Sequence, residues 1–239
     1  MKKTVLLVII TIAFLACKEN KPPESFSKMF DKHGGINSWR KLQTLSFNKG
    51  EEVHTVDLHS RKTIINTPKY SLGFDGKEVW LDEVEKGIYK GNPTFYYNLY
   101  FYFYAMPFVL ADDGITYSKV DALTFEGTKY PGYKISYAAD KGTSPDDTYI
   151  VYYNPETFQM EWLAYTVTFK SKKPSKKYNI IKYDAWEAIN GIVLPTEITW
   201  YKMDEKGMPT KPERPATAFT LPLISKDKLA ALFFEKTKN

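Results

Sequence analysis

The sequence has few of the residues and motifs that most enzymes use for catalysis. It contains one cysteine and three histidines in 239 residues, which leaves no disulfide framework and no cysteine-based zinc site. The G-x-S-x-G, H-E-x-x-H, P-loop, G-x-G-x-x-G and C-x-x-C motifs are also absent. His54 and His59 lie on strand-like sequence at an odd separation, which places them on opposite faces of a sheet. We therefore predict no catalytic residue, no metal site and no cofactor.

One enzymatic alternative stays open. A glycosidase uses two carboxylates that can lie far apart in the sequence, and clefts lined by Tyr and Trp suit sugars. Asp75, Glu78, Asp82 and Asp184 are candidates for such a pair. Nothing in the sequence selects two of them, so a non-enzymatic role is the main expectation.

Charge of one sign is not in large excess either. The formal net charge is +5, but Lys2 and Lys3 lie in a segment that we expect to be removed. Without these two, 31 basic residues remain against 28 acidic ones. Such a balance is typical of a soluble surface and does not indicate a patch that binds nucleic acid.

The first 23 residues have the pattern of an export and anchoring signal. Two lysines precede an apolar run at residues 5–15, which is too short to span a bilayer. The segment Phe14-Leu15-Ala16-Cys17 resembles the lipobox of bacterial lipoproteins, in which the cysteine becomes the acylated N-terminus. We predict a signal peptide at residues 1–16, lipidation at Cys17 and a polar tether at residues 17–23. Lys18 is not the aspartate that retains lipoproteins at the inner membrane. The resemblance therefore implies an outer-membrane lipoprotein that faces the periplasm or the medium.

An aromatic stretch dominates the centre of the chain. Residues 91–111 carry no charge, and residues 95–108 are rich in Tyr and Phe. Asn92 and Pro93 suit an N-cap and a first helical residue, and Pro107 bends or ends a helix. We predict an inserted helix at about residues 93–106, buried on most sides. A membrane span is the weaker alternative, because five tyrosines, Asn98 and Pro107 are poorly suited to hydrocarbon.

The remaining body alternates apolar and polar residues in the manner of antiparallel strands. Aromatic residues make up 16 % of the chain, an excess that favours strands. Asp75-Gly76 and Asn190-Gly191 are hairpin turn signals. Short amphipathic helices are expected at residues 24–32 and at residues 227–236, the second with Leu229, Leu232 and Phe233 facing inward. His33 follows the first helix, where a partly charged imidazole would suit the negative C-terminal end of the helix dipole. The predicted fold is mainly β with a few helices: one strongly curved antiparallel sheet around the aromatic helix, in a single domain at residues 24–239.

This layout resembles a known superfamily. The order is an N-terminal helix, antiparallel strands, an inserted helix and further strands. The motif Tyr183-x-x-Trp186 leads to Asn190-Gly191-x-x-Leu194-Pro195, which is similar to a hairpin that recurs in that superfamily. The chain thus resembles the LolA/LolB lipoprotein-localisation superfamily, and residues 100–114 resemble a signature of uncharacterised bacterial lipoproteins near that fold. The resemblance implies a half-barrel whose hollow holds acyl chains under a helical lid.

The leading functional hypothesis is therefore a lipid-anchored envelope protein. It would bind an acyl-chain-bearing or other apolar ligand without catalysis, and its anchor would place it at the membrane. The alternatives are a scaffold lipoprotein whose hollow is plugged by the aromatic helix, and a carbohydrate-binding or glycan-cleaving lipoprotein. The oligomeric state stays open. The residues expected to form the apolar lining or lid are Trp80, Tyr96, Tyr100, Phe103, Tyr104, Met106, Phe108, Trp162 and Trp200.

Overall fold

Strands dominate the structure, a computed structural model that describes residues 22–112, 114–137 and 146–237. The predicted signal peptide, Cys17 and most of the tether lie outside the described residues. The helical elements are α1 (Glu24–Lys32), α2 (Ile36–Trp39), α3 (Pro93–Tyr96), α4 (Leu99–Tyr104), η1 (Phe108–Ala111) and η2 (Ala231–Phe234). The strands are β1 (Thr44–Lys49), β2 (Glu52–Asp57), β3 (Thr63–Asn66), β4 (Tyr70–Phe74), β5 (Val79–Glu83), β6 (Ile115–Phe125), β7 (Thr128–Tyr137), β8 (Tyr149–Tyr153), β9 (Met160–Tyr165), β10 (Asn179–Ile189), β11 (Ile192–Met203), β12 (Pro209–Pro212), β13 (Thr217–Ala218) and β14 (Thr220–Ser225).

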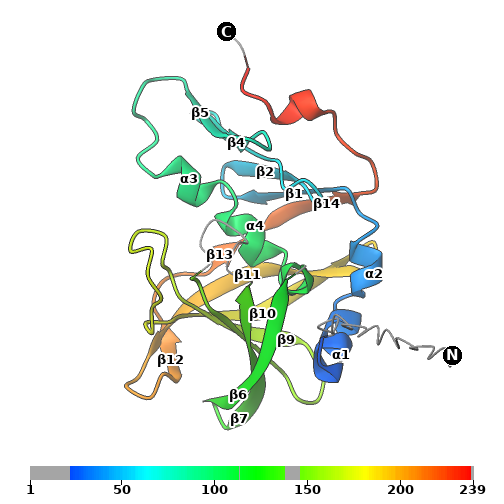
Figure 1. Ribbon diagram of the computed structural model, residues 1–239, viewed down its shortest axis with the longest axis vertical. Helices are drawn as coiled ribbons and strands as arrows, with labels where there is room; N and C mark the ends of the chain where they lie inside the picture. The colour runs from blue at the N-terminus through cyan, green and yellow to red at the C-terminus, as the bar shows by residue number, and fades with distance from the viewer. Residues whose placement is uncertain (1–21, 113, 138–145, 238–239) are drawn as a thin grey trace, which may run out of the picture.

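The strands form two antiparallel sheets. The first sheet has the order β14-β1-β2-β3-β4-β5, and the second has the order β12-β11-β10-β9-β8-β7-β6, with β13 paired to β11. The predicted mainly β fold with a curved antiparallel sheet is confirmed, but the hydrogen-bonded ladder is divided in two. Strands β1–β5 and the last strand, β14, form the first sheet, and β6–β13 form the second. The aromatic segment, which we define as residues 93–111, connects β5 to β6 (Figure 1).

The second sheet curls because its long strands contain irregularities. The β10–β11 register shifts between Lys182 and Ala185 and again between Ala185 and Trp186, and the β6–β7 register shifts between Val120 and Leu123. An extra residue on one strand bends it and increases its twist. The sheet therefore curves into a half-barrel rather than lying flat.

The aromatic segment is helical where the sequence predicts a helix, but it is broken. The side chain of Asn92 accepts a hydrogen bond from the Phe95 N–H at 3.1 Å, which is the predicted N-cap. The helix is interrupted after Tyr96, resumes at Leu99 and ends at Tyr104, before the cis peptide bond between Met106 and Pro107. Among the described residues, no helix has the length and apolar character that a bilayer crossing requires.

The main core lies between the two sheets and contains α4. It includes Leu45 and Phe47 from the first sheet and Leu163 and Ile181 from the second. Figure 1 shows α4 in the space between the sheets. The aromatic side chains that the sequence predicts to be buried therefore fill the volume that the curved sheet encloses.

Helix α1 closes one end of this core. Phe26, Met29 and Phe30 are buried, as the predicted spacing requires. Gly34 has φ +103° and approaches the β10–β11 turn so closely that a Cβ there would lie 2.1 Å from the Gly191 carbonyl oxygen. The main chains are joined by the Val193 N–H, which donates to the His33 carbonyl at 2.9 Å.

The C-terminal segment differs from its prediction. Only the short 3-10 helix η2 forms, and Leu232 and Phe233 are exposed rather than inward. Phe234 is buried against Ile64 and Trp80 instead, with Leu229 beside them. A segment this short gains little from helix formation, so its packing on the first sheet sets its conformation.

Candidate functional site

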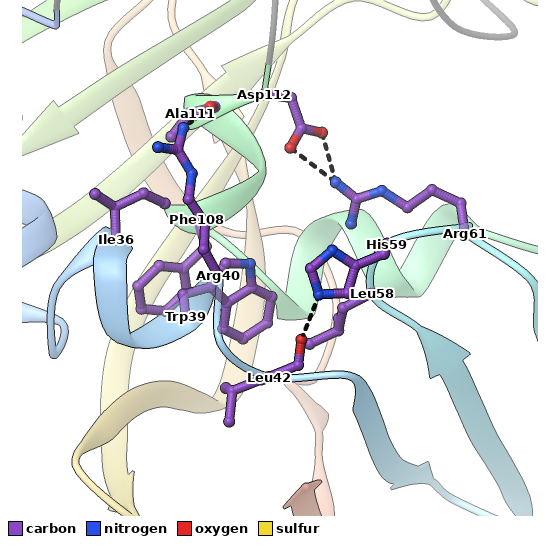
Figure 2. Close-up of a pocket in the computed structure, with 10 residues that line it drawn as sticks. All are labelled: Ile36, Trp39, Arg40, Leu42, Leu58, His59, Arg61, Phe108, Ala111 and Asp112. Atoms are coloured by element: carbon purple, nitrogen blue, oxygen red, sulfur yellow. Dashed lines mark hydrogen bonds and ion pairs between the residues drawn. The ribbon is translucent and has the colours of Figure 1, made fainter. Parts of the chain in front are cut away.

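A pocket of about 370 Å³ opens where α2, the β2–β3 turn and η1 meet (Figure 2). It lies at one end of the aromatic segment. Two sets of residues line it, one apolar and one charged or polar. The apolar residues are Ile36, Trp39, Leu42, Leu58, Phe108 and Ala111, and the polar ones are Arg40, His59, Arg61 and Asp112.

Two stacked rings form the apolar part of the wall. The rings of Trp39 and Phe108 lie 4.5 Å apart, centre to centre, at an interplanar angle of 5°. Both side chains are buried, as are Leu42 and Leu58 beside them. The rings come from α2 and η1, so their contact joins the N-terminal helices to the end of the aromatic segment.

A hydrogen-bonded turn sets the position of the polar groups. The Asp57 carboxylate accepts hydrogen bonds from the main-chain N–H of His59 at 3.0 Å and of Ser60 at 2.7 Å. Burial alone would raise the pKa of Asp57, but these hydrogen bonds outweigh it and lower that pKa. Arg61 adopts a left-handed conformation with φ 61°, and its N–H donates to the Asp57 carbonyl at 2.9 Å. The ring of His59 is fixed as well, because its Nε2 donates to the Leu42 carbonyl at 2.8 Å.

Two guanidinium groups face one carboxylate across the pocket. Arg61 Nη2 donates to both oxygens of Asp112, at 2.8 and 2.7 Å, while Arg61 Cζ lies 5.1 Å from the centre of the Phe101 ring. Arg40 Nη2 donates to the Ala111 carbonyl at 3.1 Å. Arg61 Nη1 is buried and has no acceptor among the described residues. The site is therefore a small amphipathic pocket, apolar on one side and cationic on the other.

A protein-family model matches most of the chain, including every residue that lines the pocket. The model of DUF6503, a family of unknown function, matches residues 25–210. The chain belongs to this family. No curated protein matches the sequence.

Several solved structures are similar to this DUF6503 protein at very low sequence identity. A LolA superfamily protein from Nitrosomonas europaea has 8 % identity and a TM-score of 0.40, and the match covers 87 % of this chain and 96 % of the other. A DUF1329 family protein from Desulfovibrio piger has 10 % identity and a TM-score of 0.43 over 87 % and 95 % of the two chains. A domain named as an outer membrane lipoprotein-sorting protein, from Vibrio parahaemolyticus, has 6 % identity and a TM-score of 0.36 over 85 % and 96 %. These matches assign no ligand or residue role.

The predicted lining residues of the DUF6503 chain are only partly brought together. Phe108 is the one that lines the pocket. Five others belong to the main core between the sheets or pack against it: Tyr100, Phe103, Tyr104, Met106 and Trp200. In the described conformation these five side chains fill the hollow themselves.

Trp80 and Trp162 lie away from the aromatic segment. Trp80 faces the opposite side of the first sheet, where its Nε1 donates to the Phe234 carbonyl at 2.9 Å. Trp162 and its neighbour Ala164 pack in a separate cluster, while Leu163 between them faces the main core. The alternation of side chains along a strand explains this separation.

Tyr96 takes part in a polar cluster that the sequence does not reveal. The Glu52 carboxylate accepts hydrogen bonds from Tyr96 OH at 2.9 Å and Tyr70 OH at 3.0 Å, and it lies 3.0 Å from both Lys49 Nζ and His54 Nε2. Burial would raise the pKa of Glu52, but the hydrogen bonds from His54, Lys49 and Tyr96 outweigh it and lower that pKa to about 2. The cluster fixes α3 on the first sheet.

His33 is structural, but the partial charge expected for it is wrong. Its ring is buried, its Nδ1 donates to the Val193 carbonyl at 3.2 Å, and its Nε2 accepts from the Met160 N–H at 3.3 Å. Burial lowers the pKa of His33 to about 4. Desolvation therefore outweighs the attraction of the helix dipole for a charged imidazole.

The carboxylates considered for a glycosidase do not meet in the pocket. Asp75 accepts hydrogen bonds from the N–H groups of Lys77 and Glu78 within its turn. Asp184, on the second sheet, lies 3.4 Å from Lys182 Nζ. Within the described ranges, no group of three or more His, Cys, Asp or Glu side chains is placed to hold a metal ion.

Sequence reasoning missed most of the pocket. Arg40, Leu58 and Arg61 come from short connections between elements, and the packing of η1 against α2 and the β2–β3 turn, rather than a local motif, brings them to Phe108. The only local signal is the turn that begins at Asp57, since aspartate commonly accepts hydrogen bonds from the N–H groups that follow it.

Proposed function

We propose that this protein is a lipid-anchored envelope protein that binds an acyl-chain-bearing or other apolar ligand without catalysing a reaction. The observation that carries the proposal is the pocket between α2, the β2–β3 turn and η1. Its stacked rings and leucine side chains form an apolar wall, although each is buried and polar groups make up most of the surface that the pocket exposes. Its volume of about 370 Å³ is within the range of about 300–1,000 Å³ that is common for small-molecule sites.

The aromatic segment limits the length of chain that the pocket accepts. Phe101, Tyr104 and Met106 are almost fully buried in the main core. We propose that a short apolar group enters at the Phe108 side of the pocket, whereas a longer acyl chain requires α4 to move. We propose that the predicted lining residues in the main core would then contact the ligand: Tyr100, Phe103, Tyr104, Met106 and Trp200.

The proposed anchor is the acylated Cys17 at the outer membrane. Cell fractionation tests it: wild-type protein is expected with the membranes, and a Cys17→Ala variant is expected in the soluble envelope fraction. A variant that stays with the membranes would contradict anchoring through this cysteine.

Ligand binding is tested by extracting apolar molecules from the purified protein and identifying them by mass spectrometry. The Ile36→Trp variant places a large ring at the mouth of the pocket, where Ile36 is only partly buried. It is expected to retain much less ligand than wild type. Val53→Trp is the matched control, because Val53 is exposed on β2 and does not line the pocket.

The same experiment separates the scaffold alternative from the proposal. A scaffold whose hollow is plugged by α4 would yield no bound apolar molecule from wild type or from either variant. An equal yield from Ile36→Trp and wild type would place the ligand outside this pocket.

A further inference from the structure

We infer that the pocket recognises the acidic head group of an amphiphilic ligand, a carboxylate or a phosphate, through Arg61 and Arg40. This inference rests on the proposed function, because it assigns a ligand class to the same pocket. It is carried by the charges, the unused donors and the placement of the two arginines relative to the apolar wall.

The charges leave a cationic surplus at the pocket. Arg40 and Arg61 contribute two guanidinium groups, which stay protonated in proteins. Asp112 is the one carboxylate in the wall, and it is paired with Arg61. The partner of Arg40 is the Ala111 carbonyl, which carries no formal charge. An anion that enters the pocket therefore meets a positive charge that no pocket carboxylate balances.

The donors of Arg61 are incompletely used. Both hydrogen bonds to Asp112 come from Nη2, while the buried Nη1 has no acceptor among the described residues. A guanidinium group presents paired N–H donors that match the two oxygens of a carboxylate or phosphate. The Arg61 side chain is 28 % exposed, so a small rotation can turn the unused edge toward a ligand. A bound acid would supply the acceptor that Nη1 lacks.

The placement of the arginines fits an amphiphile rather than a free anion. In the view of Figure 2, the two guanidinium groups lie toward Asp112 at one end of the pocket, while Leu42 lies at the other end. The stacked rings of Trp39 and Phe108 lie between these ends in the same view. A ligand with its acid at the arginines would therefore lay its apolar chain along the rings and leucines.

The test is calorimetric titration of three ligands with the same short chain: octanoic acid, octyl phosphate and octanol. The protein is the full chain with Cys17→Ser, so that no acyl anchor competes. Because charge-assisted hydrogen bonds are roughly twice as strong as neutral ones, at least one acid is expected to bind about tenfold more tightly than octanol. The tighter of the two acids identifies the head group.

Variants assign this preference to the arginines. Arg61→Gln and, independently, Arg40→Gln are expected to reduce the preference for the acid to about threefold or less, since each removes one cationic donor. Lys41→Gln is the charge-matched control, because Lys41 is exposed beside Arg40 and does not line the pocket. Thermal unfolding of each variant verifies that it is folded. If Arg61→Gln does not fold, Arg40→Gln alone tests the role of the arginines.

The outcomes separate this inference from the proposed function. Equal binding of acids and octanol would overturn the acidic head group and leave apolar binding intact. A preference that survives both arginine variants, or that Lys41→Gln also removes, would overturn the assignment to these arginines. Binding of acetate or inorganic phosphate as tight as that of the octyl acids would overturn the amphiphile. Absence of binding by all three octyl ligands would contradict the proposed function itself.

Discussion

Two buried phenols, one on α4 and one on β10, test how the aromatic segment is held. Tyr104 and Tyr183 are both fully buried, and burial raises the pKa of each phenol. Tyr183 OH donates to the Phe103 carbonyl at 3.0 Å, which belongs to the last turn of α4 and has no partner within the helix. Tyr104 OH has no hydrogen-bond partner among the described residues.

The two Tyr→Phe changes should therefore act in opposite directions. Tyr183→Phe leaves the Phe103 carbonyl buried and unpaired, which should lower the free energy of unfolding by about 1–3 kcal/mol. Tyr104→Phe removes an unpaired buried hydroxyl, so it should leave that free energy unchanged or raise it by about 1 kcal/mol. Each variant is the other's control, because both delete one hydroxyl from the same core.

Urea unfolding followed by tryptophan fluorescence measures both values. A difference of about 1–4 kcal/mol between the variants, with Tyr183→Phe the less stable, is expected from these two contributions. The reasoning would be refuted if Tyr104→Phe destabilised the protein by more than about 1 kcal/mol. That result would mean that the Tyr104 hydroxyl has a hydrogen-bond partner in solution, such as a water or a ligand in the hollow.

Three further predictions concern the contacts around this core. Gly34→Ala should lower the free energy of unfolding by about 3 kcal/mol in thermal unfolding, because it combines a left-handed backbone with a steric clash at the β10–β11 turn. The control, Gly50→Ala, is also left-handed but has no atom within 4 Å of the new Cβ, and it should cost about 1 kcal/mol. Equal losses in the two variants would argue against the close approach of Gly34 to the turn. Glu52→Gln should lower the free energy of unfolding by about 2 kcal/mol by weakening charged hydrogen bonds, including the one from Tyr96; an unchanged value in urea unfolding would show that the cluster does not hold α3. The pKa of His33 is about 4 in the folded chain against an ordinary value of 6.5, so between these pH values the unfolded chain binds more protons than the folded chain. The free energy of unfolding should therefore keep its full value above this pH range and fall by about 3 kcal/mol as the pH drops through it. Urea unfolding across this range should show that loss in wild type and not in His33→Gln, and the same loss in both would assign it to other groups.

Local chemistry predicted the parts of the fold that depend on neighbouring residues. Asn190 and Gly191 both have positive φ, at 49° and 83°, in the hairpin turn between β10 and β11. Asn92 caps α3, and helical structure in α4 ends before Pro107. In each case the residue's own backbone preference or side-chain acceptor determines the conformation.

Features that depend on long-range pairing could not be predicted from the sequence. The pocket joins Arg40 and Arg61 to Ala111 and Asp112, and only the packing of η1 against α2 and the β2–β3 turn brings these groups together. The division into two sheets also depends on long-range pairing, because β14 returns to pair with β1. For Trp80, hydrophobicity predicted burial but not which face of the sheet it would occupy.

Methyl NMR of the full chain with Cys17→Ser, titrated with octanoic acid, tests ligand binding in the pocket most directly. The methyl groups of Ile36, Leu42 and Leu58 line the pocket and are predicted to show the largest chemical-shift changes. Leu123 packs in the separate cluster around Trp162, so its methyl signals should remain unchanged. Unchanged pocket signals at saturating ligand, or changes concentrated at Leu123, would contradict the account.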